Sequence, residues 1–232
     1  MTELVVDWCS YKAAKYAVEH WHYSGTMPAG KTVKVGAWEY DRFIGAVIYS
    51  MGANRNIGKP YGLDQTEVCE LVRVALTEHE ANVSKIVAAT IKKLKDKDPG
   101  LRLIVSYSDT AQEHLGIIYQ AMNFVYEGEI TGGMDQLLMP DGNLYHKRSV
   151  FSKYGTCNAD ELGARWIKPP KKFKYLYPLD RAMRRQIEPL AQPYPKSCGQ
   201  SVQGNTPDYQ SGNAGSSPAV RSNMTGGEPV LV

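Results

Sequence analysis

The sequence predicts an α/β fold in which a mixed central sheet is flanked by helices and followed by a basic C-terminal extension. Segments with strand-like and helix-like patterns alternate, which is typical of a sheet with crossover helices. The run at residues 101–105 is apolar, rich in branched residues and preceded by Pro99 and Gly100, as in a strand buried on both faces. The third observation is a concentration of cations between residues 165 and 196.

The N-terminal part of the chain predicts a helix and a hairpin. Ser10 is a favoured N-cap residue, and the apolar spacing after it predicts a helix to about His20. Residues 33–39 and 43–50 are predicted to be two strands joined by a short turn. Residues 52–65 form a loop too long for a simple turn, and loops of this length in compact domains are often functional.

The middle of the chain continues the alternation. Residues 67–76 predict a strand whose alternation puts Glu70 and Arg73 on opposite faces, and residues 84–95 predict an amphipathic helix. After the strand at 101–105, residues 111–122 predict another amphipathic helix, which Asn123 would end in the left-handed conformation. Residues 124–126 would begin the next strand.

The composition is that of a globular protein, with 43% hydrophobic and 22% charged residues. No apolar run reaches the roughly 18 residues of a membrane-spanning helix, and the N-terminus lacks a signal-peptide pattern. We therefore expect a cytoplasmic protein without a membrane partner. The four cysteines form no CxxC pair, which predicts reduced thiols rather than zinc ligands.

The charge asymmetry predicts a polyanionic partner. Residues 165–196 hold nine Lys or Arg and two acidic residues, with aromatic residues among them, a combination typical of nucleic-acid surfaces. The candidate nucleic-acid contacts are Lys168, Lys171, Lys172, Lys174, Arg184 and Arg185. The segment could instead pack its aromatic residues inward, as an arm across the core.

Three regions follow from these patterns. Residues 1–155 are predicted to form a catalytic domain, and residues 156–196 a basic aromatic extension. Residues 197–232 contain many Gly, Ser, Asn and Pro and almost no large apolar residues, so we expect a disordered tail.

Polar residues follow the buried strand at 101–105. Ser106, Ser108 and Asp109 lie at its carboxyl end, where open α/β sheets bind their ligands. Asp109 could also cap the segment that follows. Arg73 lies in an otherwise apolar strand, so it must face a cleft or be paired, and its donors suit a phosphate or a carboxylate. Glu70 is expected to pair with a lysine or an arginine.

The segment HWHY supplies further candidates. His20 and His22 could be two ligands of a metal ion, although the spacing names no third ligand, and the metal stays unknown. His22 could equally be a base or a stacking contact. Tyr23 and Tyr49 are candidate substrate contacts at the same edge, with interior packing as the alternative for Tyr49.

Several segments of the chain resemble known protein families. The segment YQAMNF, which begins at Tyr119, resembles the Tyr, three residues, Gly, Phe arrangement of the GNAT (Gcn5-related N-acetyltransferase) superfamily, with Asn123 in place of Gly. The chain from Trp8 to about Lys196 resembles the Mom proteins of bacteriophages in the segments VDWCSYKAAKYAVEHWHYS, NIGKPYGLDQTEVCELVRVAL, PGLRLIVSYSD and KYLYPLDRAMRRQIEPLAQPYPK. The resemblance implies an acyltransferase-like enzyme in the bacterial host cell that converts adenine in phage DNA to its N6-carbamoylmethyl form, which protects the DNA from restriction.

This resemblance gives the candidate residues roles. Tyr119 would protonate the leaving group, Asp109 would take a proton from the acceptor amine, and Arg73 would hold a phosphate or the developing oxyanion. Either Ser106 or Ser108 would orient the substrate. The candidate substrate contacts are His22, Tyr23, Tyr49 and Glu70. Because the adenine amine is buried in duplex DNA, the expected partner is double-stranded DNA with a flipped adenine.

The acyl donor is the remaining question. GNAT acetyltransferases hold the pyrophosphate of coenzyme A in a Gly-rich loop, but the matching segment here, TEHEANVSK, contains two acidic residues and no Gly. Relatives of the fold without this loop can use aminoacyl-tRNA, so glycyl-tRNA is favoured over acetyl-CoA as donor, with transfer RNA as a second partner. The glycyl group would then rearrange to carbamoylmethyl. The alternatives are a coenzyme A-dependent acetyltransferase that acts on a protein or small molecule, and a noncatalytic DNA-binding protein.

Overall fold

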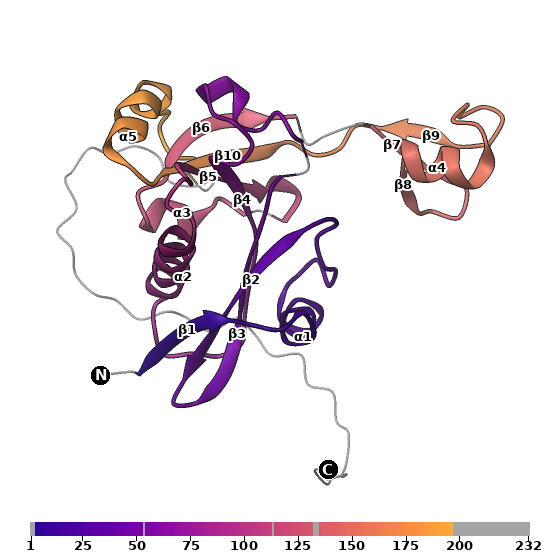
Figure 1. Cartoon of the computed structure of the whole chain (residues 1–232). Coiled ribbons are helices and arrows are strands. Elements are labelled where there is room, and N and C mark those ends of the chain that lie inside the picture. The colour runs from indigo at the N-terminus through magenta and orange to yellow at the C-terminus, as the bar shows by residue number, and fades with distance from the viewer. Residues whose placement is uncertain (1–2, 53, 113, 132–134, 197–232) are drawn as a thin grey trace, which may run out of the picture. The chain divides into compact units, whose positions relative to one another are not determined.

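The computed structural model describes residues 3–196 apart from residues 53, 113 and 132–134, so the predicted disordered tail lies outside the described residues. Its central sheet has seven strands in the order β1-β2-β3-β4-β5-β10-β6 (Figure 1). The strands are β1 (Leu4–Trp8), β2 (Thr32–Glu39), β3 (Arg42–Ser50), β4 (Val68–Leu76), β5 (Leu103–Asp109), β10 (Lys172–Pro178) and β6 (Val125–Ile130). Strands β4 and β5 are parallel and the other neighbouring pairs of this sheet are antiparallel, which makes the sheet mixed as predicted.

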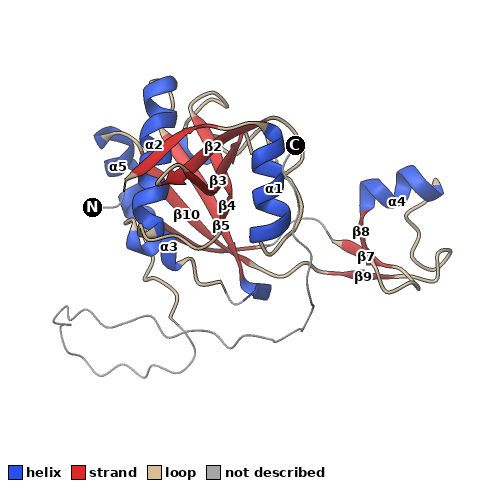
Figure 2. Ribbon diagram, turned by 90° about the horizontal axis from the view of Figure 1, so that it is seen from below, coloured by secondary structure: helices blue, strands red, loops and turns tan. Residues whose placement is uncertain are grey.

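Helices cover both faces of this sheet (Figure 2). Helix α1 (Tyr11–Trp21) packs Ala14 and other small residues against Ile48 of β3. Helix α2 (Val83–Lys97) packs Ile91 and its neighbours in one cluster with Tyr49 of β3. Consecutive side chains of a strand point to opposite faces, so α1 and α2 lie on opposite sides of the sheet. The predicted α/β class is confirmed.

Local sequence signals explain several boundaries. The Ser10 side chain accepts a hydrogen bond from the backbone N–H of Ala13 at the start of α1, as the N-cap preference predicts. The β2–β3 hairpin turns through Tyr40 and Asp41, which have φ angles of 49° and 63°. Asn123 has a φ of 57° and so adopts the predicted left-handed conformation before β6.

The helix predicted at residues 111–122 is present only in its second half. A 3-10 turn, η2 (Thr110–Gln112), follows β5, and helix α3 spans only Ile117–Ala121. Gly116 has a φ of 70°, and a Cβ atom there would lie 2.5 Å from the Tyr175 ring. The Tyr175 hydroxyl also donates a hydrogen bond to the carbonyl of Leu115. These contacts turn the chain at Gly116, so the helix can begin only after it.

A bulge in β4 changes which residues share a face. Ser50 of β3 pairs with Glu70 and Ile48 pairs with Arg73, so β4 has one residue more than β3 between these pairs. Ser50 and Ile48 are two positions apart and therefore lie on one face. Glu70 and Arg73 consequently share a face, and the predicted placement on opposite faces is wrong.

Part of the basic segment belongs to the central sheet. Strand β10 pairs with both β5 and β6. Its aromatic residues Phe173, Tyr175 and Tyr177 make ring contacts with Tyr119, Phe124 and Tyr126. The alternative that the basic segment packs its aromatic residues inward therefore holds for these three residues. Helix α5 (Arg181–Ile187) and the 3-10 turn η3 (Glu188–Leu190) follow β10.

A second, smaller sheet lies between β6 and β10 in sequence. Its strands β7 (Gln136–Leu138), β8 (Leu144–His146) and β9 (Arg165–Ile167) are ordered β8-β7-β9, and helix α4 (Lys147–Tyr154) follows β8. Leu137, Met139 and Val150 form a buried core of their own there. We call residues 135–168 the β7–β9 module. Within the described residues, no helix combines the length and apolar character needed to cross a bilayer.

Candidate active site

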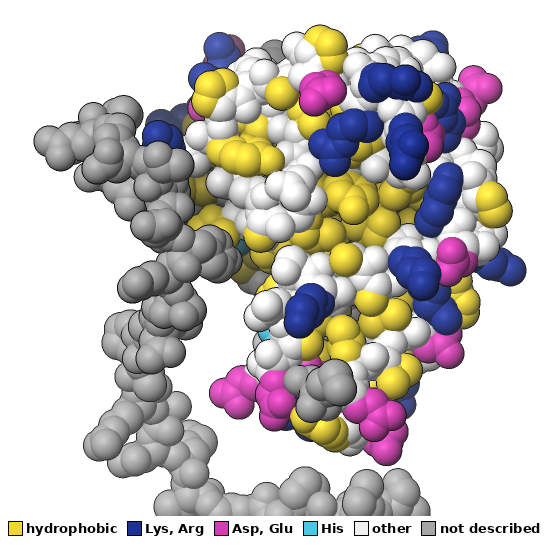
Figure 3. Space-filling view, turned by 90° about the vertical axis from the view of Figure 1, so that its left-hand side faces the viewer, with side chains coloured by type: hydrophobic (Ala, Val, Ile, Leu, Met, Phe, Trp, Pro, Cys, Tyr) yellow, Lys and Arg dark blue, Asp and Glu magenta, His cyan; other side chains and the backbone are white. Residues whose placement is uncertain are grey.

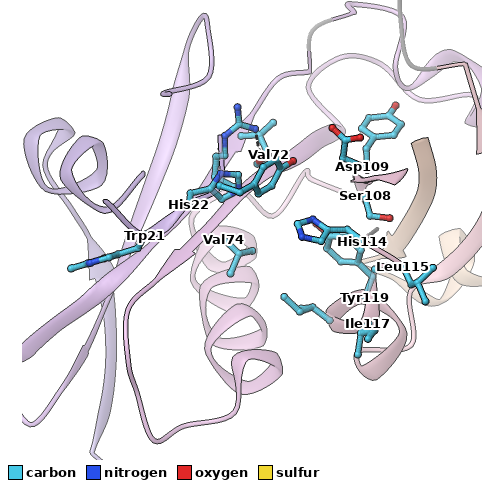
Figure 4. A pocket seen from close by; sticks show the side chains of 15 residues that line it. Trp21, His22, Val72, Val74, Ser108, Asp109, His114, Leu115, Ile117 and Tyr119 are labelled. Atoms are coloured by element: carbon cyan, nitrogen blue, oxygen red, sulfur yellow. Dashed lines mark hydrogen bonds between the residues drawn. The ribbon is translucent and has the colours of Figure 1, made fainter. Parts of the chain in front are cut away.

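A cavity opens where β4 and β5 separate. The parallel pairing of the two strands ends at Leu71 and Ser106, and a cavity of about 460 Å³ lies beyond that point. It is lined by Trp21, His22, Tyr23, Val72, Arg73, Val74, Tyr107, Ser108, Asp109, His114, Leu115, Gly116, Ile117, Ile118 and Tyr119. Figure 4 shows Ser108, Asp109 and His114 facing His22 and Val72 across this space.

The β5 side of the cavity carries two polar residues. Ser108 is only 5% exposed, and its Oγ has no hydrogen-bond partner among the described residues. Asp109 is partly exposed, and its Oδ1 accepts a hydrogen bond of 3.0 Å from the backbone N–H of Ala111. Asp109 therefore has the local capping role that the sequence left open, while its side chain also lines the cavity.

Arg73 faces the same cavity from β4. Its Nη1 donates to the carbonyl of Val72 at 2.8 Å, but its Nε is buried without a hydrogen-bond partner in the described part of the chain. Buried polar groups in proteins are nearly always paired. Unpartnered donors on Arg73 and Ser108 in one cavity therefore suit a ligand with acceptor oxygens.

Tyr119 and Ser106 form a buried polar pair beside the cavity. Burial raises the pKa of the Tyr119 hydroxyl, and a hydrogen bond with Ser106 opposes this rise. Ser106 is fully buried, and its hydroxyl donates to the carbonyl of Leu71 at 2.9 Å. Burial is the larger of the two effects on the pKa of Tyr119, so the phenol stays protonated, with its hydroxyl positioned next to Ser106.

His22 is held in one neutral form. Burial, together with the smaller effects of Arg73 and His114, lowers the pKa of His22 to about 4. The backbone N–H of Ser24 donates to Nδ1 at 3.1 Å, so the proton of the neutral ring is on Nε2. In this neutral form His22 is a hydrogen-bond donor through Nε2.

Aromatic rings border the cavity next to Asp109. The Tyr23 ring lies edge-on to the His114 ring, with 5.0 Å between the centroids, and 4.4 Å from the His22 ring. Burial raises the pKa of Tyr23, and the negative charge of Asp109 raises it further. Tyr23 is therefore a neutral phenol close to the Asp109 carboxylate.

Comparison with known proteins identifies the family. A model of the Mom protein family matches residues 3–196. The chain belongs to the Mom protein family. A relative in this family, named methylcarbamoylase mom from Escherichia phage Mu, is 23% identical over 213 residues, which cover 84% of each chain.

Solved structures similar to this Mom family chain include an acetyltransferase and a complex with acetyl-CoA. Arabidopsis thaliana NAA60 in complex with acetyl-CoA has a TM-score of 0.47 and 9% identity, with 76% of this chain and 98% of the other covered. A Bacillus subtilis acetyltransferase in complex with CoA has a TM-score of 0.45 and 13% identity, with coverage of 78% and 100%.

Two candidate substrate contacts of this family member, Tyr49 and Glu70, do not line this cavity. Tyr49 is 1% exposed and shares a hydrogen bond of 2.8 Å with Thr90 of α2, so the prediction of a substrate contact is wrong and the packing alternative holds. Glu70 lines a separate cavity of about 410 Å³ with Asn54 and Asn56. That cavity uses the loop at 52–65, which contains the 3-10 turn η1 (Lys59–Tyr61).

The two histidines do not act together. His20 stacks on Tyr16 with 4.0 Å between the ring centroids, and its Nδ1 contacts the Tyr16 carbonyl, whereas His22 lines the main cavity. Among the described residues, no group of three His, Cys, Asp or Glu side chains is placed to hold a metal ion.

The six basic candidates divide into two groups. Lys168 and Arg185 are exposed. Separately, Figure 3 shows lysine and arginine side chains gathered on the face on which α2 and α5 lie in Figure 1. The other four have partners or line a cavity: Lys171 pairs with Glu129 and Lys174 with Glu127, Arg184 donates to the Asn123 carbonyl, and Lys172 lines the second cavity. The Lys174 side chain is only 13% exposed, so it is best described as half of a structural ion pair.

The segment before α2 is held by a buried carboxylate. Glu39 is 2% exposed, and its carboxylate accepts hydrogen bonds of 2.9 Å and 2.7 Å from the backbone N–H groups of Glu80 and Ala81. An internal carboxylate thus already binds two backbone amides of the loop that precedes α2. The sequence showed the acidic loop but gave no sign of Glu39, because the contact joins residues about 40 positions apart.

The structure adds cavity residues that the sequence did not single out. His114 and Trp21 line the cavity, and so does Tyr107, which also borders the second cavity. Trp21 lies in the segment HWHY, so proximity to His22 was a usable signal. His114 was predicted to lie within a helix, but it precedes α3, and nothing in its local pattern marked it.

Proposed function

We propose that the protein modifies adenine in double-stranded DNA by transferring a glycyl group to the exocyclic amine, and that this group then rearranges to N6-carbamoylmethyl. The observation that carries the proposal is the pair of buried, unpartnered donors, Arg73 Nε and Ser108 Oγ, in one cavity with Asp109 and Tyr119. Acyl transfer to an amine needs donors for an oxyanion, a proton acceptor and a proton source. The phage Mu relative bears the name methylcarbamoylase, which supports the same product class.

The first step forms an amide. The adenine amine attacks the carbonyl carbon of a glycyl ester, a carbon–nitrogen bond forms, and Asp109 takes the proton that the amine loses. The carbonyl oxygen becomes an oxyanion, to which Arg73 and Ser108 donate. The ester carbon–oxygen bond then breaks, and Tyr119 gives its proton to the leaving ribose oxygen. Because the amine is delocalised into the purine and is a poor nucleophile, positioning and proton removal must supply much of the rate.

The second step is an isomerisation without a further reactant. The free amine of the N6-glycyl group attacks C6 of the purine and closes a five-membered ring. The bond from C6 to the original nitrogen then breaks, and that nitrogen leaves as the amide nitrogen. The product carries a carbamoylmethyl group on the nitrogen that came from glycine.

The donor in this proposal is glycyl-tRNA rather than acetyl-CoA. The Glu39 carboxylate holds the amides of Glu80 and Ala81, which argues against a pyrophosphate at this loop. An aminoacyl ester needs no such loop, because its phosphates belong to the transfer RNA and can lie outside the cavity. The transfer RNA is therefore a second partner in this account.

The acceptor is a flipped adenine. A cavity of about 460 Å³ falls within the range of small-molecule sites, roughly 300–1,000 Å³, and accommodates one base with the glycyl ester. The rings of Tyr23 and His22 offer stacking surfaces, and the Nε2–H of His22 can donate to a ring nitrogen of the base. Glu70 contacts the substrate from the second cavity in this proposal.

Reconstitution tests the proposal. Purified protein, duplex DNA and charged glycyl-tRNA are incubated together, and the DNA is digested and its nucleosides are examined by mass spectrometry. Modified adenine that requires the charged donor is the expected result. Modification supported by acetyl-CoA alone would point to an ordinary acetyltransferase, and DNA binding that never yields a modified base would point to a noncatalytic protein.

A further inference from the structure

Helix α4 and strand β9 place cations and aromatic rings on the surface of the β7–β9 module. The helix sequence KRSVFSKY contains three cations and no acidic residue. Lys147, Phe151 and Tyr154 are exposed and follow one another at spacings of four and three, so they lie along one stripe of the helix. We call Lys147, Phe151, Lys153, Tyr154 and Trp166 the α4 surface.

The aromatic residues of the α4 surface are not needed to fill the module core. Leu137 and Val150 are fully buried, and Tyr145, Cys157 and Leu162 pack around them. By contrast, Phe151 is 61% exposed and Trp166 is 40% exposed. A module that already has a core, yet exposes its largest rings beside cations, has a surface suited to a partner.

The cations lie next to these rings. Lys147 Nζ is 6.0 Å from the centroid of the Trp166 ring, and Lys153 Nζ is 5.0 Å from that of Tyr154. Cation–π contacts hold the lysines at the rings without neutralising their charge. The surface therefore combines positive charge with exposed π faces.

The module is an insertion that the central sheet does not require. Ile130 at the end of β6 and Lys172 at the start of β10 are a register pair. A short turn could join these two residues, yet the chain makes an excursion of about 40 residues between them. Such an excursion adds a surface without altering the sheet that positions the cavity.

We propose that the α4 surface is a docking site for duplex DNA, with Lys147 and Lys153 on backbone phosphates and Phe151 as an apolar wedge against the base stack. This inference rests on the proposed function in so far as the substrate is DNA. Proteins that open or kink a duplex often insert an apolar side chain between base steps and place cations on the flanking phosphates. Local unstacking lowers the cost of flipping the adenine.

The inference is tested by measuring how tightly the protein binds a labelled DNA duplex of about 30 base pairs. Fluorescence anisotropy reports the binding at several salt concentrations, and no acyl donor is present. The variant Lys147→Ala/Lys153→Ala should weaken binding about tenfold and lower the salt slope by about 2, because each phosphate contact contributes about 1. Phe151→Ala should weaken binding without changing the slope. The matched control Lys92→Ala/Lys97→Ala removes the same charge from exposed positions of α2 and should stay within about twofold of the wild type.

The outcomes separate this inference from the proposed function. Weakened DNA binding by the α4 variants upholds the inference even if no modified adenine is ever found. Unchanged DNA binding overturns it, and so does an equal loss in the α2 control or a loss confined to transfer RNA binding. Circular dichroism of each variant should match the wild type, because the substituted side chains are exposed; if Lys147→Ala/Lys153→Ala unfolds, Phe151→Ala, at a 61% exposed position, decides the question.

Discussion

The backbone N–H of Ser24 donates a hydrogen bond of 3.1 Å to Nδ1 of His22. This contact and the pKa of about 4 make His22 a neutral ring that donates through Nε2 over the whole physiological range. The cavity therefore contains a hydrogen-bond donor at this position. From the sequence alone, His22 could have been a base, a metal ligand or a stacking contact.

Activity should not depend on titration of His22. The folded-state pKa is lowered from 6.5 to about 4, so His22 adds stability that is present above pH 6.5 and is lost as the pH falls toward 4. NMR titration of the ring should show no protonation between pH 8 and pH 5.5. His22→Gln, which keeps an N–H donor, should retain more activity than His22→Phe, and an inflection near pH 6.5 in the rate profile that His22→Gln removes would contradict the assignment.

Tyr119→Phe should lower the modification rate by roughly 10²- to 10⁴-fold, the usual contribution of a general acid. The phenylalanine ring keeps the contacts with Phe124 and Tyr175, so the melting temperature should change little. Tyr11→Phe, at an exposed position outside the cavity, is the matched control. A Tyr119→Phe variant with more than a tenth of the wild-type rate would remove the phenol from the proton transfer.

The two serines of β5 should respond in opposite ways. Ser108→Ala removes a buried hydroxyl without a hydrogen-bond partner, so the free energy of unfolding should stay equal or rise while substrate turnover falls. Ser106→Ala breaks the bond to the Leu71 carbonyl and should lower the free energy of unfolding by about 1–3 kcal/mol. Chemical denaturation and single-turnover kinetics measure the two effects; a Ser108→Ala protein that is destabilised but fully active would refute the account of that residue.

Glu39 should stabilise the loop before α2 in a pH-dependent way. Burial raises the pKa of Glu39, but hydrogen bonds from Glu80 and Ala81 outweigh this and leave the pKa below its usual value. Its stabilising contribution is therefore present above pH 4.5 and is lost as the pH falls below that value. Glu39→Gln should flatten the acid limb of a melting-temperature profile, and acetyl-CoA should not shift the melting temperature of the wild type. A clear upward shift with acetyl-CoA would show that the loop accepts the cofactor after all.

Local patterns in the sequence predicted much of the fold. Ser10, the hairpin at Tyr40 and Asp41, and the apolar run after Gly100 each act through neighbours in the chain, and the corresponding elements are present. The helix predicted at 111–122 begins later than expected, because the ring and hydroxyl of Tyr175 turn the chain at Gly116. Tyr175 lies about 60 residues away in the sequence. The pattern of apolar residues within 111–122 gives no information about a contact with such a distant residue.

In the candidate site, too, local sequence patterns predicted some residues correctly and missed contacts between distant residues. One cavity is lined by four of the predicted residues, Arg73, Ser108, Asp109 and Tyr119. The sequence could predict this because polar residues at or near the ends of apolar strands are visible in the local pattern. Tyr49 does not, because Thr90 of α2 offers its hydroxyl a buried partner. The bulge at Val72, which brings Glu70 and Arg73 to one face, depends on pairing with β3 and leaves no mark in the alternation itself.

The most direct measurement follows the nitrogen of glycine. Glycyl-tRNA charged with glycine that carries heavy nitrogen is supplied to the protein with unlabelled duplex DNA, and the modified nucleoside is analysed by fragmentation in a mass spectrometer. Glycyl transfer followed by rearrangement predicts the label on the nitrogen bonded to C6 of the purine and none in the carboxamide. A label confined to the carboxamide, or a product without any label, would contradict the account.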